Sequence, residues 1–181
     1  MTFEVGKDQK KNAFSELINC LSFAKFSKND SHVLATRDYL CCRLWDIRAA
    51  ERMPYMSCHI TDYLERSLVA LYEDDSIYDK FFMDMSPDCN YLLTGAYNKS
   101  GHIIDINGEN NITFQANVDV KRGRTVGKVR KYEPNKKLKP LEGATQIDFK
   151  KKVQCGGWNP KDNTVALAFR NCIFLYYDKV K

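Results

Sequence analysis

The sequence predicts an all-β protein built from three copies of one antiparallel unit. Three segments of equal length recur, each running from Ser or Asn to an Asp 19 residues later, at 27–46, 86–105 and 159–178. Within each segment short apolar runs alternate with polar turns, which is typical of short strands joined by hairpins rather than of a helix. The residue before each segment is apolar as well, being Phe26, Met85 and Trp158 in turn.

An antiparallel meander of this kind cannot bury both of its faces by itself. Packing against further copies of itself covers them, and this is the architecture of a β-propeller. The hydrophobe–Asp endings and the Ser-Pro-Asp turn at 86–88 are similar to those of WD repeats, whose blades have four strands. The sequence departs from that pattern because no Gly-His dipeptide precedes any of the three units; Gly101-His102 lies inside the second unit. The turn position usually held by Asp has Tyr39, Asn98 and Asn171.

We therefore predict an incomplete WD-repeat β-propeller of about three blades, with repeat units at about 14–57, 77–118 and 145–181. The closing Asp residues are 59 and 73 residues apart, whereas the usual WD period is about 40–45 residues. Two insertions account for the difference. One is an acidic helical insertion at about 59–80, and the other is a basic loop at about 117–145.

The first insertion contains a predicted short helix followed by an acidic loop. An apolar face formed by Leu64, Leu68, Leu71 and Tyr72 predicts a helix from about residue 63 to residue 72. Asp62 followed by Glu65 is a candidate N-cap pair for this helix. The run Glu73-Asp74-Asp75, together with Asp79, would attract basic partners by electrostatic steering. The flanking Tyr72 and Tyr78 are side chains that protein interfaces favour.

The second insertion is rich in Lys, Arg, Gly and Pro, so we expect a mobile loop. The net charge of the chain is +5, but residues 121–140 alone hold nine Lys or Arg and one Glu, and the remainder is net −3. The basic loop supports an alternative function, an RNA-associated or generic scaffolding propeller fragment. Tyr132 is the only stacking residue in the loop, and no groove-reading fold is apparent, so we do not expect nucleic-acid binding.

Composition places the chain among folded proteins that lack a catalytic or metal motif. It has 181 residues with 44% hydrophobic content, no apolar run long enough to span a membrane, and no signal-peptide core, so we expect the cytosol or the nucleus. The seven cysteines include no C-x-x-C and the three histidines are scattered, which predicts reduced, mostly buried thiols and neither metal nor cofactor. No nucleophile-elbow, P-loop, zinc-protease or kinase signature is present. An enzyme is therefore the third hypothesis, and it would require phosphatase activity from this chain alone.

Several strings of the chain resemble the B-family WD-repeat regulatory subunit of protein phosphatase 2A. These strings are FSELINCLSFAKFS, TRDYL, LWDI, DYLERSLVALYEDDSIYDKF, LLTGAYN, RTVGKVRK and YYDKVK, and the resemblance covers roughly residues 12–181. It implies a non-catalytic subunit of a heterotrimer. In that family a separate metal-dependent catalytic subunit carries the phosphatase chemistry and a helical-repeat subunit is the scaffold. The WD-repeat subunit recruits phosphoprotein substrates with basic segments to an acidic groove.

The resemblance also implies which residues form that groove. The family motif Tyr-Glu-x-Asp-x-x-aromatic-Asp-Lys matches Tyr72, Glu73, Asp75, Tyr78, Asp79 and Lys80. Tyr78 stands where the family commonly has Phe, which keeps the ring and adds a hydroxyl. The implied substrate-binding residues therefore lie in the same acidic insertion that the charge pattern singles out.

The resemblance covers only the C-terminal part of a family whose full chain forms seven blades. The early blades, including the hairpin that similar proteins use to contact the scaffold, have no counterpart in this sequence. We expect a piece of a longer product, with a truncated paralogue as the alternative. Three blades in a row leave two uncovered faces, so we expect self-association of the chain expressed alone.

Overall fold

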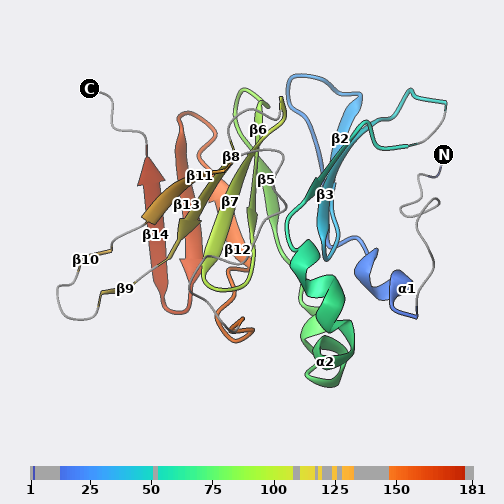
Figure 1. Cartoon of the computed structure of the whole chain (residues 1–181). Helices are drawn as coiled ribbons and strands as arrows, with labels where there is room; N and C mark the ends of the chain where they lie inside the picture. Colours follow the sequence, from blue (N-terminus) through green and yellow to red (C-terminus); the bar gives the residue numbers. More distant parts are fainter. Residues whose placement is uncertain are drawn as a thin grey trace.

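A computed structural model describes residues 2, 13–50, 53–107, 111–116, 118–119, 124–125, 128–132 and 147–177. The described residues form mostly β structure with little helix, which confirms the predicted all-β class. Three antiparallel sheets and one two-stranded ribbon contain the strands. Figure 1 shows the three sheets side by side, with the helical segments gathered at one end of the first sheet.

The first sheet is an antiparallel meander in which four consecutive strands pair in sequence order. The strands are β1 (Phe23–Phe26), β2 (Val33–Arg37), β3 (Cys41–Asp46) and β4 (Met56–His59). The third of them is buried along most of its length, as expected for a strand covered on both faces. Trp45 lies on this strand, and its indole N–H donates a hydrogen bond to Thr36 Oγ1 at 2.8 Å.

The second sheet has the order β11-β8-β7-β6-β5. Its strands are β5 (Met83–Met85), β6 (Tyr91–Gly95), β7 (Ser100–Asp105), β8 (Asn111–Gln115) and β11 (Lys128–Tyr132). The strand β11 corrects the prediction of a loop at 117–145. That segment also contributes β9 (Val118–Asp119) and β10 (Arg124–Thr125), which pair with each other. An edge strand is held by backbone hydrogen bonds, so a polar sequence can form one. The rest of the basic loop lies outside the described residues.

The third sheet has three strands in the order β12-β13-β14. They are β12 (Cys155–Trp158), β13 (Thr164–Phe169) and β14 (Cys172–Tyr177). Buried and less buried residues alternate along β13, as in a strand with one face on a core. The last strand is an edge strand among the described residues.

A backbone hydrogen bond closes the turn after the first strand at the equivalent position of all three sheets. The backbone N–H groups of Ser27, Ser86 and Asn159 each donate to the carbonyl of the first residue of the next strand, at 2.9, 2.9 and 2.8 Å. A second shared bond follows Asp46 and Asp105, where Ile47 donates to His32 and Ile106 donates to Asn90, both at 2.9 Å. The spacing read from the sequence therefore corresponds to recurring backbone geometry.

Two hydrophobic clusters join the three sheets face to face. One lies between the first and second sheets and includes Leu44 and Leu92, and the other lies between the second and third sheets and includes Leu93 and Leu167. The first strands of the sheets also meet, because β5 contacts both β1 and β12. Asp84 on β5 lies at this meeting point. Its carboxylate pairs with Lys25 of β1 and accepts a hydrogen bond from the Trp158 N–H of β12 at 2.7 Å.

The helical segments lie before the first sheet and between the first and second sheets. They are α1 (Ser15–Ile18), the 3₁₀ segment η1 (Asp62–Ser67), α2 (Leu68–Glu73) and the 3₁₀ segment η2 (Ser76–Tyr78). The predicted helix at 63–72 is thus a 3₁₀ turn followed by a short α-helix. The predicted N-cap was wrong, because Thr61 is the cap residue, no side chain caps η1, and the Asp62 carboxylate bonds to His59 instead.

All seven cysteines are free thiols. The expectation that they are mostly buried was wrong, since only Cys41 and Cys42 are buried while Cys20 and Cys155 are exposed. In the part of the chain that the structure describes, no helix has the length and apolar character needed to cross a lipid bilayer.

Candidate functional site

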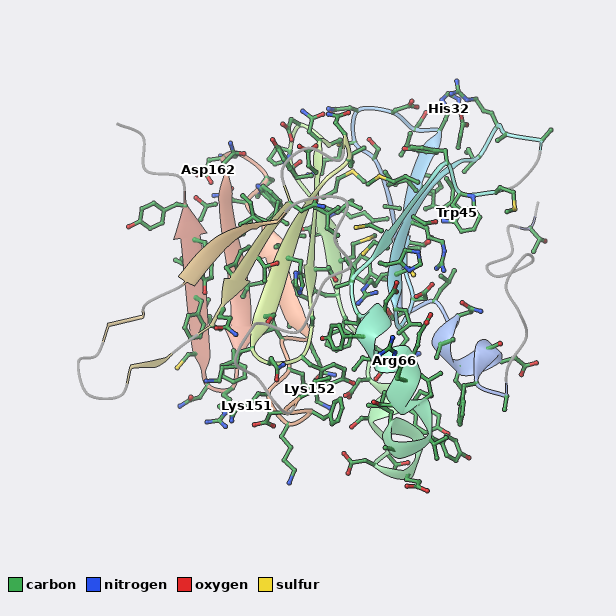
Figure 2. The ribbon with its side chains drawn as sticks, viewed as in Figure 1. His32, Trp45, Arg66, Lys151, Lys152 and Asp162 are labelled. Atoms are coloured by element: carbon green, nitrogen blue, oxygen red, sulfur yellow. The ribbon has the colours of Figure 1, made fainter. Side chains whose placement is uncertain are left out.

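The acidic insertion is attached to the sheets by a hydrophobic cluster of its own. Leu64, Leu68 and Leu71 from its helical segments are buried together with Tyr39 and Tyr97, which come from turns of the first and second sheets. The three leucines of the predicted apolar face are therefore buried and fix the insertion at one end of the stacked sheets. Tyr72, the fourth residue predicted for that face, is 48% exposed, so the prediction was wrong for this residue. In Figure 2 Arg66 marks this end, and His32 and Asp162 mark the opposite end.

A left-handed residue ends α2 and turns the chain toward η2. Asp75 has φ 55°, and its N–H donates to the Tyr72 carbonyl at 3.2 Å. Asp is among the non-glycine residues that tolerate this conformation, because its short polar side chain can bond locally. The turn places Tyr78 beside Tyr72, with their ring centroids 6.2 Å apart.

Two tyrosines and three carboxylates form an exposed surface on this turn, which we call the tyrosine–acid surface (Tyr72, Glu73, Asp74, Asp75 and Tyr78). The two tyrosines are 48% and 50% exposed, and the three acidic residues are exposed as well. Phe14 extends the aromatic part, because its ring centroid lies 5.7 Å from that of Tyr72. Tilted ring pairs at this distance stabilise one another, so the aromatic side chains are held in place before any partner binds.

Asp79 faces inward, away from the tyrosine–acid surface. Its carboxylate pairs with Lys152, accepts a hydrogen bond from the Tyr97 hydroxyl at 2.8 Å, and lies 3.3 Å from Gln154 Nε2. The side chain is only 11% exposed. Its charge is therefore used inside the protein, where it ties the insertion to the segment that precedes the third sheet.

The Asp79 contact belongs to a buried network that includes two tyrosine hydroxyls. The Tyr39 and Tyr97 hydroxyl oxygens are 2.9 Å apart, and both lie within hydrogen-bond distance of the Ser76 carbonyl. Burial raises the pKa of Tyr97 far above its ordinary value, and the nearby Tyr39 and Asp79 raise it further. Tyr97 therefore keeps its proton and acts as a hydrogen-bond donor to the carboxylate.

The six residues that the sequence singled out divide into two groups. Tyr72, Glu73, Asp75 and Tyr78 come together on the exposed turn, and Lys80 is exposed at its end. Asp79 belongs to the buried network instead. Sequence reasoning missed Phe14, Lys152 and Tyr97, because each is contributed by a segment far along the chain from the insertion and carries no local motif.

A group that could hold a metal ion lies where the first sheet meets the insertion. Among the described residues it consists of Cys41, His59 and Asp62, at the start of η1 rather than on the tyrosine–acid surface.

No protein-family model matches the sequence.

Proposed function

We propose that this chain is a non-catalytic regulatory subunit of a serine/threonine protein phosphatase 2A holoenzyme. In this proposal it binds the phosphatase catalytic subunit and the helical-repeat scaffold subunit, and it selects phosphoprotein substrates that carry basic segments. The chemistry belongs to the catalytic subunit. We expect the assembly in the cytosol or the nucleus.

The observation that carries the proposal is the tyrosine–acid surface. Three carboxylates beside two half-exposed tyrosines form a surface that attracts Lys- and Arg-rich segments and offers them aromatic contact area. Arg and Lys side chains also bind over tyrosine rings by cation–π attraction. The motif resemblance points to the same turn, since Tyr72, Glu73, Asp75 and Tyr78 all belong to it.

The arrangement of the sheets supports the proposal that the chain forms part of a WD-repeat propeller. Successive meanders pack face to face through the two clusters described above. Their first strands meet at β5, with β1 on one side and β12 on the other. Blades that share a central axis have this arrangement, because the innermost strand of each blade lies nearest the axis.

Binding of a phosphopeptide with flanking Lys and Arg residues tests the assignment of the surface. The test variant, Glu73→Gln with Asp75→Asn, removes two negative charges. It keeps the backbone turn, because Asn tolerates the left-handed conformation. We expect affinity to fall roughly fivefold to tenfold by fluorescence anisotropy, which corresponds to about 1–1.4 kcal/mol.

A charge-matched control is available at the opposite end of the molecule. Asp162→Asn with Asn163→Lys also changes the net charge by +2 at exposed positions, and the amide introduced at position 162 retains an oxygen to accept the Thr164 N–H bond. We expect less than a twofold change for this control. An equal loss of affinity in both variants would show a general charge effect. Unchanged affinity in the test variant would contradict the assignment of substrate binding to the tyrosine–acid surface.

A further inference from the structure

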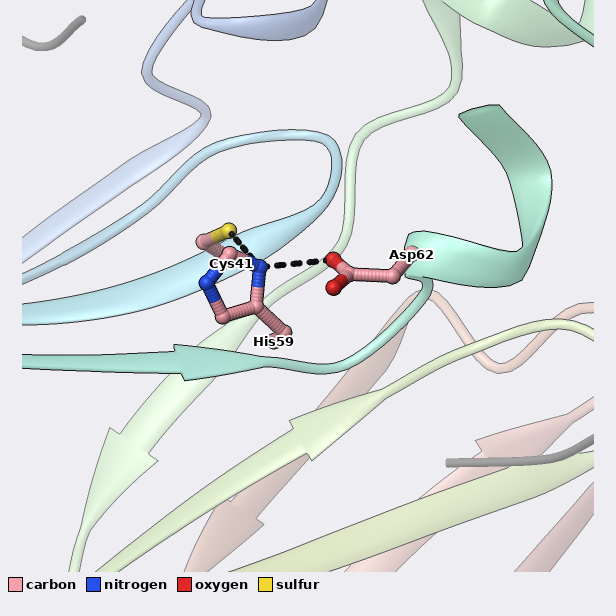
Figure 3. A group of neighbouring side chains, drawn as sticks. All are labelled: Cys41, His59 and Asp62. Carbon is pink, nitrogen blue, oxygen red and sulfur yellow. Dashed lines mark hydrogen bonds and ion pairs between the residues drawn. The ribbon is translucent and has the colours of Figure 1, made fainter. Parts of the chain in front are cut away.

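Three potential metal ligands meet where the first sheet ends and the acidic insertion begins. Cys41 starts β3, His59 ends β4, and the two are cross-strand partners in the ladder. Asp62 is the first residue of η1. Cys41 Sγ lies 3.3 Å from His59 Nδ1, and Asp62 Oδ1 lies 2.7 Å from the same nitrogen (Figure 3).

The geometry does not suit a catalytic relay. In a nucleophile–His–Asp relay the nucleophile and the carboxylate contact opposite nitrogens of the imidazole, so that a proton can be taken at one and the ring oriented at the other. Here the thiol and the carboxylate both face Nδ1. A neutral imidazole nitrogen can serve only one of them by hydrogen bonding. Convergence of sulfur, nitrogen and oxygen on one point is instead the arrangement that a metal ion needs.

The donor set suits zinc and similar transition-metal ions. The three ligand atoms all lie within 4.8 Å of one another. Zinc bonds of about 2.0 Å to nitrogen or oxygen and about 2.3 Å to sulfur, in a tetrahedral geometry, place ligand atoms about 3.3–3.6 Å apart. The sulfur–nitrogen distance is already close to that value, and a small rotation of the Asp62 side chain opens the nitrogen–oxygen distance. Mg²⁺ and Ca²⁺ prefer all-oxygen sites, so thiol and imidazole ligands select against them.

The surroundings hold the ligands and leave a path to solvent. The Cys41 N–H donates to Asp38 Oδ1 at 2.7 Å, and Asp38 in turn pairs with Arg43, which fixes the start of β3. Cys41 is buried, whereas the His59 side chain is 51% exposed, so an ion can enter from the His59 side and keep a water molecule as its fourth ligand. Arg37 is a buried cation nearby, so a bound ion needs the negative charges of the thiolate and the carboxylate.

We propose that Cys41, His59 and Asp62 bind one divalent transition-metal ion of the zinc class. Binding forms a metal–sulfur bond, breaks the thiol S–H bond and releases that proton to solvent, with no change of oxidation state. The ion would link β3 and β4 to the first turn of the acidic insertion. This inference does not depend on the proposed function. The sequence shows no metal motif here because ligand convergence depends on the β3–β4 register.

Titration of the metal-free full chain with Co²⁺ tests the proposal. We expect tetrahedral d–d bands and a thiolate-to-cobalt charge-transfer band that saturate at about one equivalent, and we expect Zn²⁺ to displace the signal. Cys41→Ser should abolish the charge-transfer band. His59→Gln and Asp62→Asn should each weaken Co²⁺ binding roughly tenfold or more, because loss of a direct ligand costs at least as much as loss of an outer partner.

His32 and Asp30 provide a matched control. Their side chains form a His–Asp pair of similar length, 3.0 Å, and both are exposed. His32→Gln should leave the cobalt spectrum unchanged. The proposal is overturned if no thiolate band appears at one equivalent, or if the band persists in Cys41→Ser and so arises from another thiol. If Cys41→Ser fails to fold, unchanged affinity in both His59→Gln and Asp62→Asn also overturns it.

Discussion

Asp79 illustrates how one residue of an acidic motif can have a structural role. The motif resemblance places it with the substrate-binding residues, yet its carboxylate contacts Lys152 and Tyr97 inside the protein. Charge reversal at this position would therefore disturb the fold as well as any recognition surface. Glu73 and Asp75 are exposed and are the residues whose charge can be changed for a functional test.

Asp79→Asn should destabilise the fold by about 2 kcal/mol, because it weakens charge-assisted bonds to two partners. Glu73→Gln, an exposed change on the same insertion, should alter stability by no more than about 0.5 kcal/mol. Urea unfolding followed by circular dichroism measures both variants. Equal stability of the two variants would contradict the role given to Asp79.

His102 gives the fold a pH dependence of its own. It lies on β7 with Nδ1 at 3.0 Å from Thr113 Oγ1, and burial together with the nearby Arg37 lowers its pKa to about 4. The unfolded chain takes up this proton near pH 6.5 and the folded chain does not, so stability is present above pH 6.5 and is lost as the pH falls toward 4.

For His102 alone the free energy of unfolding should fall by about 2 kcal/mol between pH 7 and pH 5. His102→Asn removes the titrating group and should reduce the pH dependence by that amount. The difference between the two proteins in urea unfolding at both pH values isolates this effect from other titrating groups. The same slope in the variant and the wild type would show that His102 is not held neutral.

At the scale of elements, the turns and the buried leucines of the helix, which local pattern and spacing determine, were predicted from the sequence. Turns at Ser27, Ser86 and Asn159 share one backbone bond, and the three leucines of the insertion are buried as their period indicated, although Tyr72 of the same predicted face is exposed. The edge strand β11 was not anticipated, because its sequence is basic and its pairing with β8 carries no local signal. The inward direction of Asp79 was missed because Tyr97 and Lys152 lie far away in sequence.

The close approach of β6 to the segment that precedes β12 explains why position 95 holds glycine. A Cβ built on Gly95 of β6 would lie 1.9 Å from the Val153 carbonyl oxygen, whereas one on Gly157 of β12 would lie 3.6 Å from Asp84 Oδ2. Gly95→Ala should therefore cost about 1–3 kcal/mol or more, since the nearest atom belongs to the backbone. Gly157→Ala is the matched control and should change stability much less. Equal melting temperatures for the two variants would contradict this packing.

At the scale of the molecule, the third sheet presents an apolar face to solvent. Ile173, Leu175 and Tyr177 alternate along β14 and are 73%, 62% and 67% exposed. Leu175 and Ile173 pair with Ala166 and Ala168, whose small side chains do not cover them. An exposed apolar face beside an edge strand favours association.

We expect the isolated chain to self-associate through this face. Light scattering should show a mass that rises with concentration, and Leu175→Lys should lower it. Asn171→Lys adds the same charge in the neighbouring exposed turn and should have little effect. A monodisperse monomer of 21.0 kDa with a cooperative melt would contradict the expectation.

Reconstitution with the phosphatase subunits tests the proposed function most directly. The full chain is mixed with the scaffold and catalytic subunits of protein phosphatase 2A and separated by size-exclusion chromatography. We predict one peak that contains all three chains and carries phosphatase activity. A chain that is folded by circular dichroism, yet elutes apart from the scaffold–catalytic pair, would contradict the proposal.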